Sequence, residues 1–142
     1  MVCLNHDGNV IDAAVKASVA ALRNLTLPAV VVESDEDNAV AEDVIKVDAS
    51  DRSLLRLGAQ PTTCTLAVFE DRILTDPTAE EEGLSSSVVS VALDPSSGVL
   101  CQLQKAGGAP VSRERLQECT ALAKKQAKRI AKMVDAAAPA KI

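Results

Sequence analysis

Aromatic residues are nearly absent from this chain of 142 residues: Phe69 is the only one, and tryptophan and tyrosine do not occur. Aliphatic side chains must therefore build the hydrophobic core, and the hydrophobic content of 47% is enough to build one. No apolar run approaches the roughly 18 residues of a transmembrane helix, and no basic segment leads into a short apolar one. We therefore expect neither a membrane span nor a signal peptide.

Metal ligands and reactive side chains are equally sparse. The chain has one histidine and four cysteines without a CxxC pair, which gives no zinc pattern and no evident disulfide framework. Cys3 and His6 could pair as nucleophile and base, but no carboxylate is placed to orient the histidine. We favour reduced, mostly buried thiols in an intracellular protein, with no metal and no cofactor.

Charge is distributed unevenly. Residues 1–111 hold 17 acidic and 7 basic residues, a net charge of −10, whereas residues 112–142 hold 3 acidic and 8 basic residues, a net charge of +5. This asymmetry predicts one basic face on an acidic body. The basic residues stack on the last predicted helix, where they could contact RNA or a partner, although a solvated helix face explains them as well: Lys124, Lys125, Lys128, Arg129 and Lys132.

Hydrophobic periodicity predicts an α+β (mixed α/β) fold with helices packed on a mixed sheet. The segment 87–94 alternates strictly, and a Pro-Ser-Ser-Gly turn returns the chain with Val99, Cys101 and Leu103 inward. Strands are expected at 1–4, 29–34, 42–50, 62–69, 73–75, 87–94 and 99–105, and helices at 10–25 and from Ser112, as N-cap, to 137.

The first predicted helix is apolar almost all round, since its charged residues form one narrow stripe. Such a helix is either buried by its own domain or covered by a second body. The chain also starts directly with apolar residues, and we expect it to begin midway through a fold. We expect residues 1–137 to be part of one domain and residues 138–142 to be a frayed tail.

The stretch NHDGNVIDAA joins a Gly turn to a helix N-terminus, a geometry that usually binds anions through free backbone N–H groups. Asp12 in the first helical turn opposes that use, and no Lys, Arg, Ser or Thr lies between Gly8 and Ala14. The loop KAGGAP could be a second anion-binding nest or a simple connection. Asp76, Glu80, Glu81 and Glu82 could bind a metal, but helix capping by Asp76 and a solvated acidic face are favoured.

Three segments occur in one order: DGNVIDAA, TLAVFEDRILTDPTAEEE and VVSVALDPSSGVLCQLQKAGG, followed by the basic helix. Together they resemble the second half of an RNase PH-type domain, and they are most similar to the inactive ring subunits of the eukaryotic RNA exosome. The resemblance covers about residues 2–135 and implies an RNase PH-like, ribosomal protein S5 domain 2-like fold. Residues 1–137 would then be the C-terminal portion of that domain.

The resemblance also implies which groups are missing. Phosphorolytic members carry an Arg or a Ser/Thr group after the DG pair, where this chain has Ile11 and Asp12. They carry an aspartate at the start of the strand after the acidic connection, where this chain has Val88, or Ser87 after a slip of one residue. These substitutions predict a protein that is not an enzyme, because neither phosphate nor a divalent cation is bound.

By the same resemblance we expect a non-catalytic structural subunit that supports 3′→5′ RNA processing and degradation, including rRNA processing, through assembly and RNA positioning. Its partners would be other RNase PH-like exosome subunits in a hetero-hexameric ring, with RNA reached through the complex, in nucleus, nucleolus and cytoplasm. Two alternatives stay open: an active phosphorolytic 3′→5′ exoribonuclease, and an unrelated small α/β domain that binds a phosphate-containing ligand.

Overall fold

A computed structural model describes residues 1–33, 44–70 and 72–137. The chain divides into two compact units. The first contains residues 1–20 and 58–142, and the second contains residues 21–57. The sequence predicted that residues 1–137 are part of one domain, and the structure divides them between these two units.

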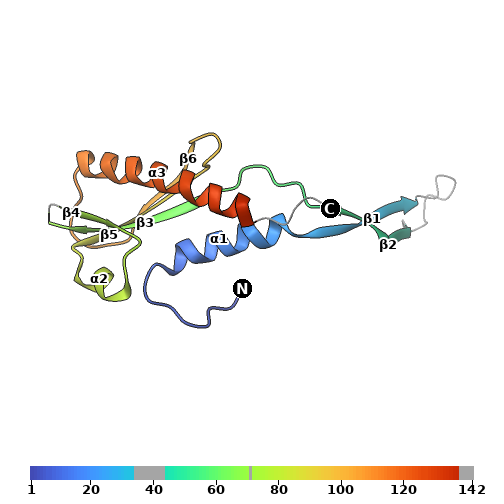
Figure 1. Cartoon of the computed structure of the whole chain (residues 1–142), viewed down its shortest axis with the longest axis horizontal. Coiled ribbons are helices and arrows are strands. Elements are labelled where there is room, and N and C mark those ends of the chain that lie inside the picture. Colours follow the sequence, from blue (N-terminus) through green and yellow to red (C-terminus); the bar gives the residue numbers. More distant parts are fainter. Residues whose placement is uncertain (34–43, 71, 138–142) are drawn as a thin grey trace. The chain divides into compact units, whose positions relative to one another are not determined.

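The first unit is built on a four-stranded antiparallel sheet with the strand order β4-β3-β5-β6 (Figure 1). Its strands are β3 (Thr62–Phe69), β4 (Arg72–Thr75), β5 (Ser87–Leu93) and β6 (Leu100–Lys105). The predictions for β3 and β5 are confirmed, since the strand boundaries differ by at most one residue. Short connections join β3 to β4 and β5 to β6, which explains the antiparallel pairing within those two hairpins, whereas β3 and β5 are connected through β4 and α2.

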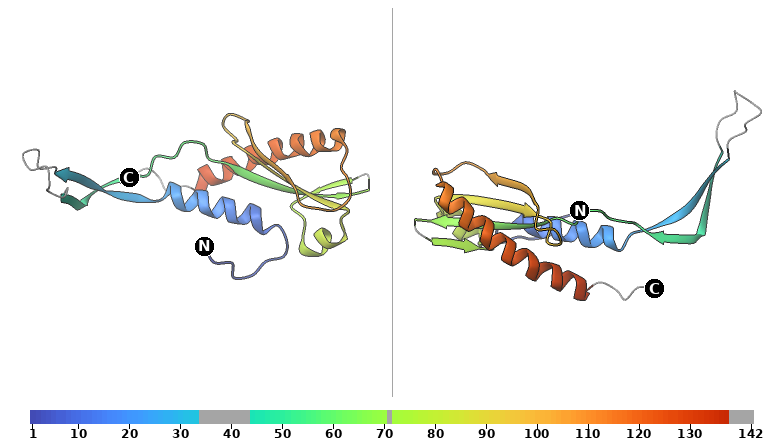
Figure 2. Two further views of the ribbon diagram at one scale, coloured as in Figure 1. Left: turned by 180° about the vertical axis from the view of Figure 1, so that it is seen from behind. Right: turned by 90° about the horizontal axis from the view of Figure 1, so that it is seen from above.

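The long helix α3 (Arg113–Ala137) lies along one face of this sheet, against β3 and β5 (Figure 2). Every second residue of β5 is buried, as the alternating sequence predicts. The core contains Leu66, Val89, Val91 and Leu93 from the sheet, and the small side chains Cys119, Ala123 and Ala127 from the helix. Small residues on the helix let it approach the sheet closely. Ser112 caps it through a hydrogen bond from Arg115 N to its Oγ (3.2 Å), as predicted.

The prediction that Val99, Cys101 and Leu103 lie inward, in the core, is wrong because all three are exposed. Residues 100–104 of β6 are all exposed, and Val99 precedes the strand with 60% of its surface accessible. The physical reason is position: β6 is the edge strand of its sheet, and α3 packs against β3 and β5. Alternation finds the strand, but burial depends on what covers its faces.

The opposite face of the sheet is covered by the first turns of α1 (Val10–Arg23) and by α2 (Ala79–Leu84). Residues 62–68 of β3 are therefore buried on both faces. Most of α1 is exposed or half-buried, and Asp12 is its one buried residue. The first unit thus leaves the apolar sides of this helix bare. Residues 1–4 form no strand, contrary to expectation, and Leu4 is 95% exposed. They have no neighbouring strand to pair with in the described chain.

The second unit is an antiparallel ribbon of β1 (Thr26–Glu33) and β2 (Val44–Leu54). Arg52 ties its open end by donating hydrogen bonds to Thr26. Every described residue of β2 is exposed, and apolar residues on both strands are more than half exposed: Val30, Val31, Val32, Val44, Ile45, Val47 and Leu54. Part of the predicted strand 42–50, and residue 34 of the predicted strand 29–34, lie outside the described residues.

Candidate functional site

Two turns from distant parts of the sequence pack against each other in the first unit. Gly8 adopts a φ of +80°, and a Cβ at this position would lie 2.5 Å from the carbonyl carbon of Thr78 and 2.6 Å from the backbone nitrogen of Ala79. Only glycine tolerates both this backbone conformation and this close approach. The DG turn before α1 is therefore fitted to the DPT turn before α2.

Two carboxylates, one from the DG turn and one from α2, accept hydrogen bonds from backbone N–H groups at the start of the opposite helix. Asp7 Oδ1 accepts a hydrogen bond from the backbone N–H of Ala79 (3.2 Å), the first residue of α2. Glu82 Oε1 accepts one from the backbone N–H of Asn9 (2.8 Å), directly before α1. Carboxylates at helix N-termini are stabilised by the helix dipole. The N–H group of Asn9 is thereby occupied by a protein carboxylate.

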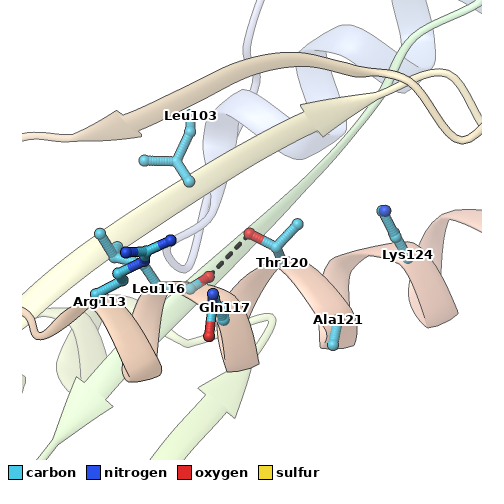
Figure 3. A pocket seen from close by; sticks show the side chains of 7 residues that line it. All are labelled: Leu103, Arg113, Leu116, Gln117, Thr120, Ala121 and Lys124. Carbon is cyan, nitrogen blue, oxygen red and sulfur yellow. Dashed lines mark hydrogen bonds between the residues drawn. The ribbon is translucent and has the colours of Figure 1, made fainter.

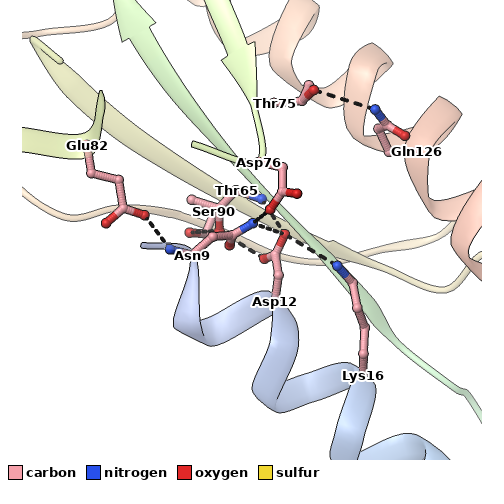
Figure 4. A network of polar contacts seen from close by, with 9 residues as sticks. All are labelled: Asn9, Asp12, Lys16, Thr65, Thr75, Asp76, Glu82, Ser90 and Gln126. Carbon is pink, nitrogen blue, oxygen red and sulfur yellow. Dashed lines mark hydrogen bonds and ion pairs between the residues drawn. The ribbon is translucent and has the colours of Figure 1, made fainter. Parts of the chain in front are cut away.

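Asn9 connects the two turns through its side chain. It is buried, with a φ of +45°, and its Nδ2 donates to Asp12 Oδ2 (3.1 Å) and to the carboxylate of Asp76 (Figure 4). Asp76 itself has a φ of +59°, a left-handed conformation that asparagine and aspartate adopt more readily than other non-glycine residues. One amide thus bridges two carboxylates that would otherwise repel each other.

Asp12 extends this network onto the sheet. Its side chain is almost fully buried, and its two oxygens accept hydrogen bonds from the backbone N–H and the hydroxyl of Thr65, both at 2.9 Å. The Thr65 hydroxyl also lies 3.0 Å from the hydroxyl of Ser90 on β5. Lys16, one turn along α1, lies 4.0 Å from the Asp12 carboxylate. Asp12 therefore holds α1 onto β3.

The predicted site residues Ile11, Asp12 and Val88 differ in solvent exposure. Asp12 belongs to the polar network, whereas Ile11 is 53% exposed. Val88 is half-buried on β5, where it is paired with Ala67 and lies two residues from Ser90 on the same sheet face. The structure thus brings Asp12 and the strand of Val88 to the same side of β3. Their roles as altered phosphate and catalytic positions stay predictions.

In the acidic connection between β4 and β5, Thr78 and Glu81 cap the start of α2. The prediction that Asp76 starts the helix is wrong: Thr78 is the N-cap, and it forms a capping box with Glu81. The Asp76 carboxylate instead accepts a hydrogen bond from the Asn9 amide, and the backbone of Asp76 is left-handed. Among the described residues, no group of three or more His, Cys, Asp or Glu side chains could hold a metal ion.

The other candidate regions are structurally simple. The loop after β6 docks on the start of β5 through a hydrogen bond from Ala109 N to Ser86 O (2.9 Å), and Lys105 Nζ donates to the carbonyls of Gly107 and Gly108. Those contacts suit a connecting loop. All five basic residues of the predicted face are on α3, and Lys124, Lys125, Lys128, Arg129 and Lys132 are all exposed.

Burial separates the four cysteines into two pairs. Cys3 and Cys101 are exposed, whereas Cys64 and Cys119 are buried free thiols. Burial, together with the negative charge of Asp12, raises the pKa of Cys64 to about 12, and burial also raises the pKa of Cys119. His6 and Cys3 both lie in the exposed segment before α1. The buried thiols are therefore structural side chains.

Sequence reasoning missed the partners of Asp12. Thr65 and Ser90 are polar residues inside predicted strands, and this polarity was the one signal available for them, although two further threonines of β3 and Ser87 of β5 share it. Asn9 and Glu82 carried no such signal, because both sit in polar stretches of sequence. Their pairing depends on how the two turns meet.

Comparison with known proteins gives a consistent set of relatives. Residues 59–126 match the model of the 3′ exoribonuclease family, domain 2. The exosome complex component rrp43 of Schizosaccharomyces pombe is 29% identical over 124 residues, which cover 87% of this chain and 43% of that protein. The exosome complex component Rrp42 of Methanopyrus kandleri is 30% identical over 133 residues, covering 94% of this chain and 46% of that protein.

Solved structures agree with these relatives. A chain of the Archaeoglobus fulgidus exosome with RNA bound to the active site aligns with a TM-score of 0.70 and 25% identity, covering 92% of this chain and 45% of that chain. A chain of an archaeal exosome core aligns with a TM-score of 0.71. The chain spans less than half the length of the curated relatives it matches. No helix in the described part of the chain is long and apolar enough to cross a membrane.

Proposed function

Because this chain has an RNase PH-like fold, and because residues 59–126 match the second domain of the 3′ exoribonuclease family, we propose that it acts in the exosome ring as a non-catalytic structural subunit. In this role it supports 3′→5′ RNA processing and degradation, including rRNA processing. Its partners are other RNase PH-like subunits of a hetero-hexameric ring. It works without a cofactor, in nucleus, nucleolus and cytoplasm.

The proposal that the subunit is non-catalytic is supported by one observation: the protein's own carboxylates surround the DG turn. Glu82 accepts the hydrogen bond of the Asn9 N–H group, and Asp12 and Asp76 lie on either side of the Asn9 amide. A carboxylate about 4 Å from a phosphate repels it by roughly 4 kcal/mol near a protein surface. An arginine would instead contribute about 1.5–3 kcal/mol for each charge-assisted hydrogen bond.

Together these terms lower phosphate affinity by roughly a thousandfold or more, at 1.4 kcal/mol per factor of ten. Ile11, which lies where phosphorolytic relatives are expected to carry a phosphate-binding group, is apolar and half exposed. Val88 offers no carboxylate for a divalent cation on the neighbouring strand. On this proposal, both expected parts of a phosphorolytic centre are replaced.

Exposed apolar surface supports a role in assembly. The β1–β2 ribbon exposes apolar residues on both strands, and Val31 and Ile45 are 57% and 65% exposed. Large exposed apolar patches on soluble proteins mark interaction surfaces. A ring subunit would bury such surface against its neighbours. The exposed basic residues of α3 would contribute to RNA positioning through phosphate contacts.

An active phosphorolytic 3′→5′ exoribonuclease remains the alternative, and one observation favours it. The matched family is a family of exoribonucleases, and the described fold retains the turn, helix start and strand at which phosphorolytic relatives are expected to carry their chemistry. The two proposals differ in whether this chain itself consumes inorganic phosphate.

The test is a phosphorolysis assay on the purified chain, alone and co-expressed with RNase PH-like exosome subunits. End-labelled single-stranded RNA is incubated with and without inorganic phosphate, and released nucleoside diphosphates are measured. We expect stable co-purification with those subunits and no phosphate-dependent release from this chain. Nucleoside diphosphate release that requires phosphate and rises with the concentration of this chain alone would establish the alternative. If the chain co-purified with no RNase PH-like subunit, the proposal of a structural role in the ring would be wrong.

A further inference from the structure

A groove lies between the edge strand β6 and the first half of α3 (Figure 3). Its volume is about 390 Å³, and its apolar floor includes Leu103 from β6 and Leu116 and Ala121 from α3. Thr120, which also lines it, satisfies its own hydroxyl by donating to the carbonyl of Leu116 (2.8 Å). The volume is at the low end of the range for ligand pockets, about 300–1,000 Å³, so it suits a few side chains.

The β6 edge beside this groove is open. In the described part of the chain, β6 pairs only with β5, so one row of its backbone N–H and C=O groups has no strand partner. Proteins usually protect such an edge with charges, proline or a bulge that twists it away. The sequence of β6, LCQLQK, has no proline, and its single lysine donates hydrogen bonds to the carbonyls of the following loop. The pairing of β6 with β5 does shift register between Leu100 and Gln102, near the start of the strand, whereas residues 102–105 pair regularly.

Two leucines of β6 face the groove side of the sheet. Leu103 is paired with Val91 and Leu100 with Leu93, so both share the sheet face on which α3 packs. Yet they are 38% and 45% exposed, because α3 lies over β3 and β5 rather than over β6. The exposed leucines and the open backbone edge are therefore adjacent parts of one surface.

Charge restricts what can bind there. Arg113 and Lys124 stand at the two ends of the helical wall, and none of the residues that line the groove is acidic. An occupant with acidic side chains is attracted at both ends, while its apolar side chains enter between them. A strand supplies this arrangement, because alternate side chains point to opposite faces.

We propose that the β6 edge and its groove form a docking site for an extended, acidic and apolar segment of a partner protein, which adds to the sheet as a further strand. Backbone hydrogen bonds to β6 would supply affinity, and the pocket between Leu103 and Leu116 would select apolar residues on one face of the segment. Arg113 and Lys124 select for acidic residues. This site does not depend on ring formation or on phosphorolysis.

The test measures binding of a fluorescein-labelled peptide, in which leucine alternates with aspartate, to the full chain by fluorescence anisotropy. A peptide with lysine in place of aspartate, and one with N-methyl groups on the backbone nitrogens of one edge, are the ligand controls. We expect saturable binding of the acidic peptide only, because the first control removes the charge match and the second removes the strand hydrogen bonds.

Matched charge reversals locate the binding site on the protein. Arg113→Glu together with Lys124→Glu should weaken the peptide about tenfold or more, as attractive pairs become repulsive ones. Lys128→Glu together with Lys132→Glu makes the same charge change on the same helix outside the groove, and should weaken it less than about twofold. Leu103→Ser should weaken binding without a change in the circular dichroism spectrum.

Four results would overturn the proposal. These are absence of saturable binding by the acidic peptide, undiminished binding of the N-methylated peptide, and equal weakening by the two double variants. The fourth is displacement of the peptide by single-stranded polyuridylate, combined with loss of RNA binding in the Arg113→Glu and Lys124→Glu variant. That last result would assign the groove to nucleic acid.

Discussion

Replacing Asp12 by alanine tests whether the buried network joins α1 to the sheet. The Asp12 carboxylate accepts hydrogen bonds from the backbone N–H and the hydroxyl of Thr65 and from the Asn9 amide, at 2.9, 2.9 and 3.1 Å. The Thr65 hydroxyl keeps a partner in Ser90. Its N–H group, however, is left buried without an acceptor, and the Asn9 amide keeps only Asp76.

The expected loss follows from these groups. A buried donor without a partner costs about 1–3 kcal/mol, and a hydrogen bond to a charged group makes a net contribution of about 1.5–3 kcal/mol after exchange with water. Because part of the network is rescued, we expect Asp12→Ala to lower the free energy of unfolding by about 2–4 kcal/mol. The measurement is urea unfolding followed by circular dichroism near neutral pH.

Lys16→Ala is the matched control, because it removes the cation 4.0 Å from the same carboxylate but leaves all three hydrogen bonds. The Lys16 side chain is 32% exposed, so its loss should cost less than about 1 kcal/mol. A double-mutant cycle with Thr65→Val should give a coupling energy of about 0.5–3 kcal/mol with Asp12. Equal effects of Asp12→Ala and Lys16→Ala, or no coupling to Thr65, would refute the assignment of Asp12 as the joint.

Two further predictions concern the packed turn and the buried thiols. Gly8→Ala should lower the free energy of unfolding by about 2 kcal/mol or more, because residue 8 has a φ of +80° and its new Cβ would lie 2.5 Å from the carbonyl carbon of Thr78. Gly83→Ala is the control: a Cβ at residue 83 meets open space, so the substitution should raise the free energy of unfolding by about 0.5–1 kcal/mol. Thermal unfolding of the two variants measures the difference, and shifts of the same sign would contradict it. Cys3 and Cys101 should react rapidly with an aromatic disulfide reagent at mildly alkaline pH, while Cys64, whose pKa burial raises to about 12, and Cys119 should react only after urea is added. Uniform reaction of all four thiols in the folded protein would show that the second pair is accessible.

Local sequence patterns were sufficient for the main elements of the first unit. The alternation in residues 87–94 and the apolar run 62–69 predicted β5 and β3 within one residue, because a strand exposes its period of two directly in the sequence. The long amphipathic α3 and its Ser112 cap were equally evident. The order of the DG, DPT and hairpin segments also indicated the RNase PH-like fold, which the family match supports.

Position within the sheet could not be predicted from those patterns. Both strands of the hairpin formed by β5 and β6 carry alternating apolar residues, yet alternate residues of β5 are buried whereas residues 100–104 of β6 are exposed. The difference arises because β3 pairs with the other side of β5 and α3 packs over those two strands. Residues 1–4 likewise read as a strand, but in the described chain they have no partner.

The candidate site shows the same division between local and tertiary information. By itself, the sequence determined that Asp12 follows a Gly turn at a helix start, since that depends only on neighbouring residues. Only the tertiary structure decided that the Asp12 carboxylate bonds to Thr65, and that Glu82 caps the helix that begins next to Asn9. Those partners are 53 and 73 residues away, and a hydrogen bond across such a distance exists only once the sheet has brought the two turns together.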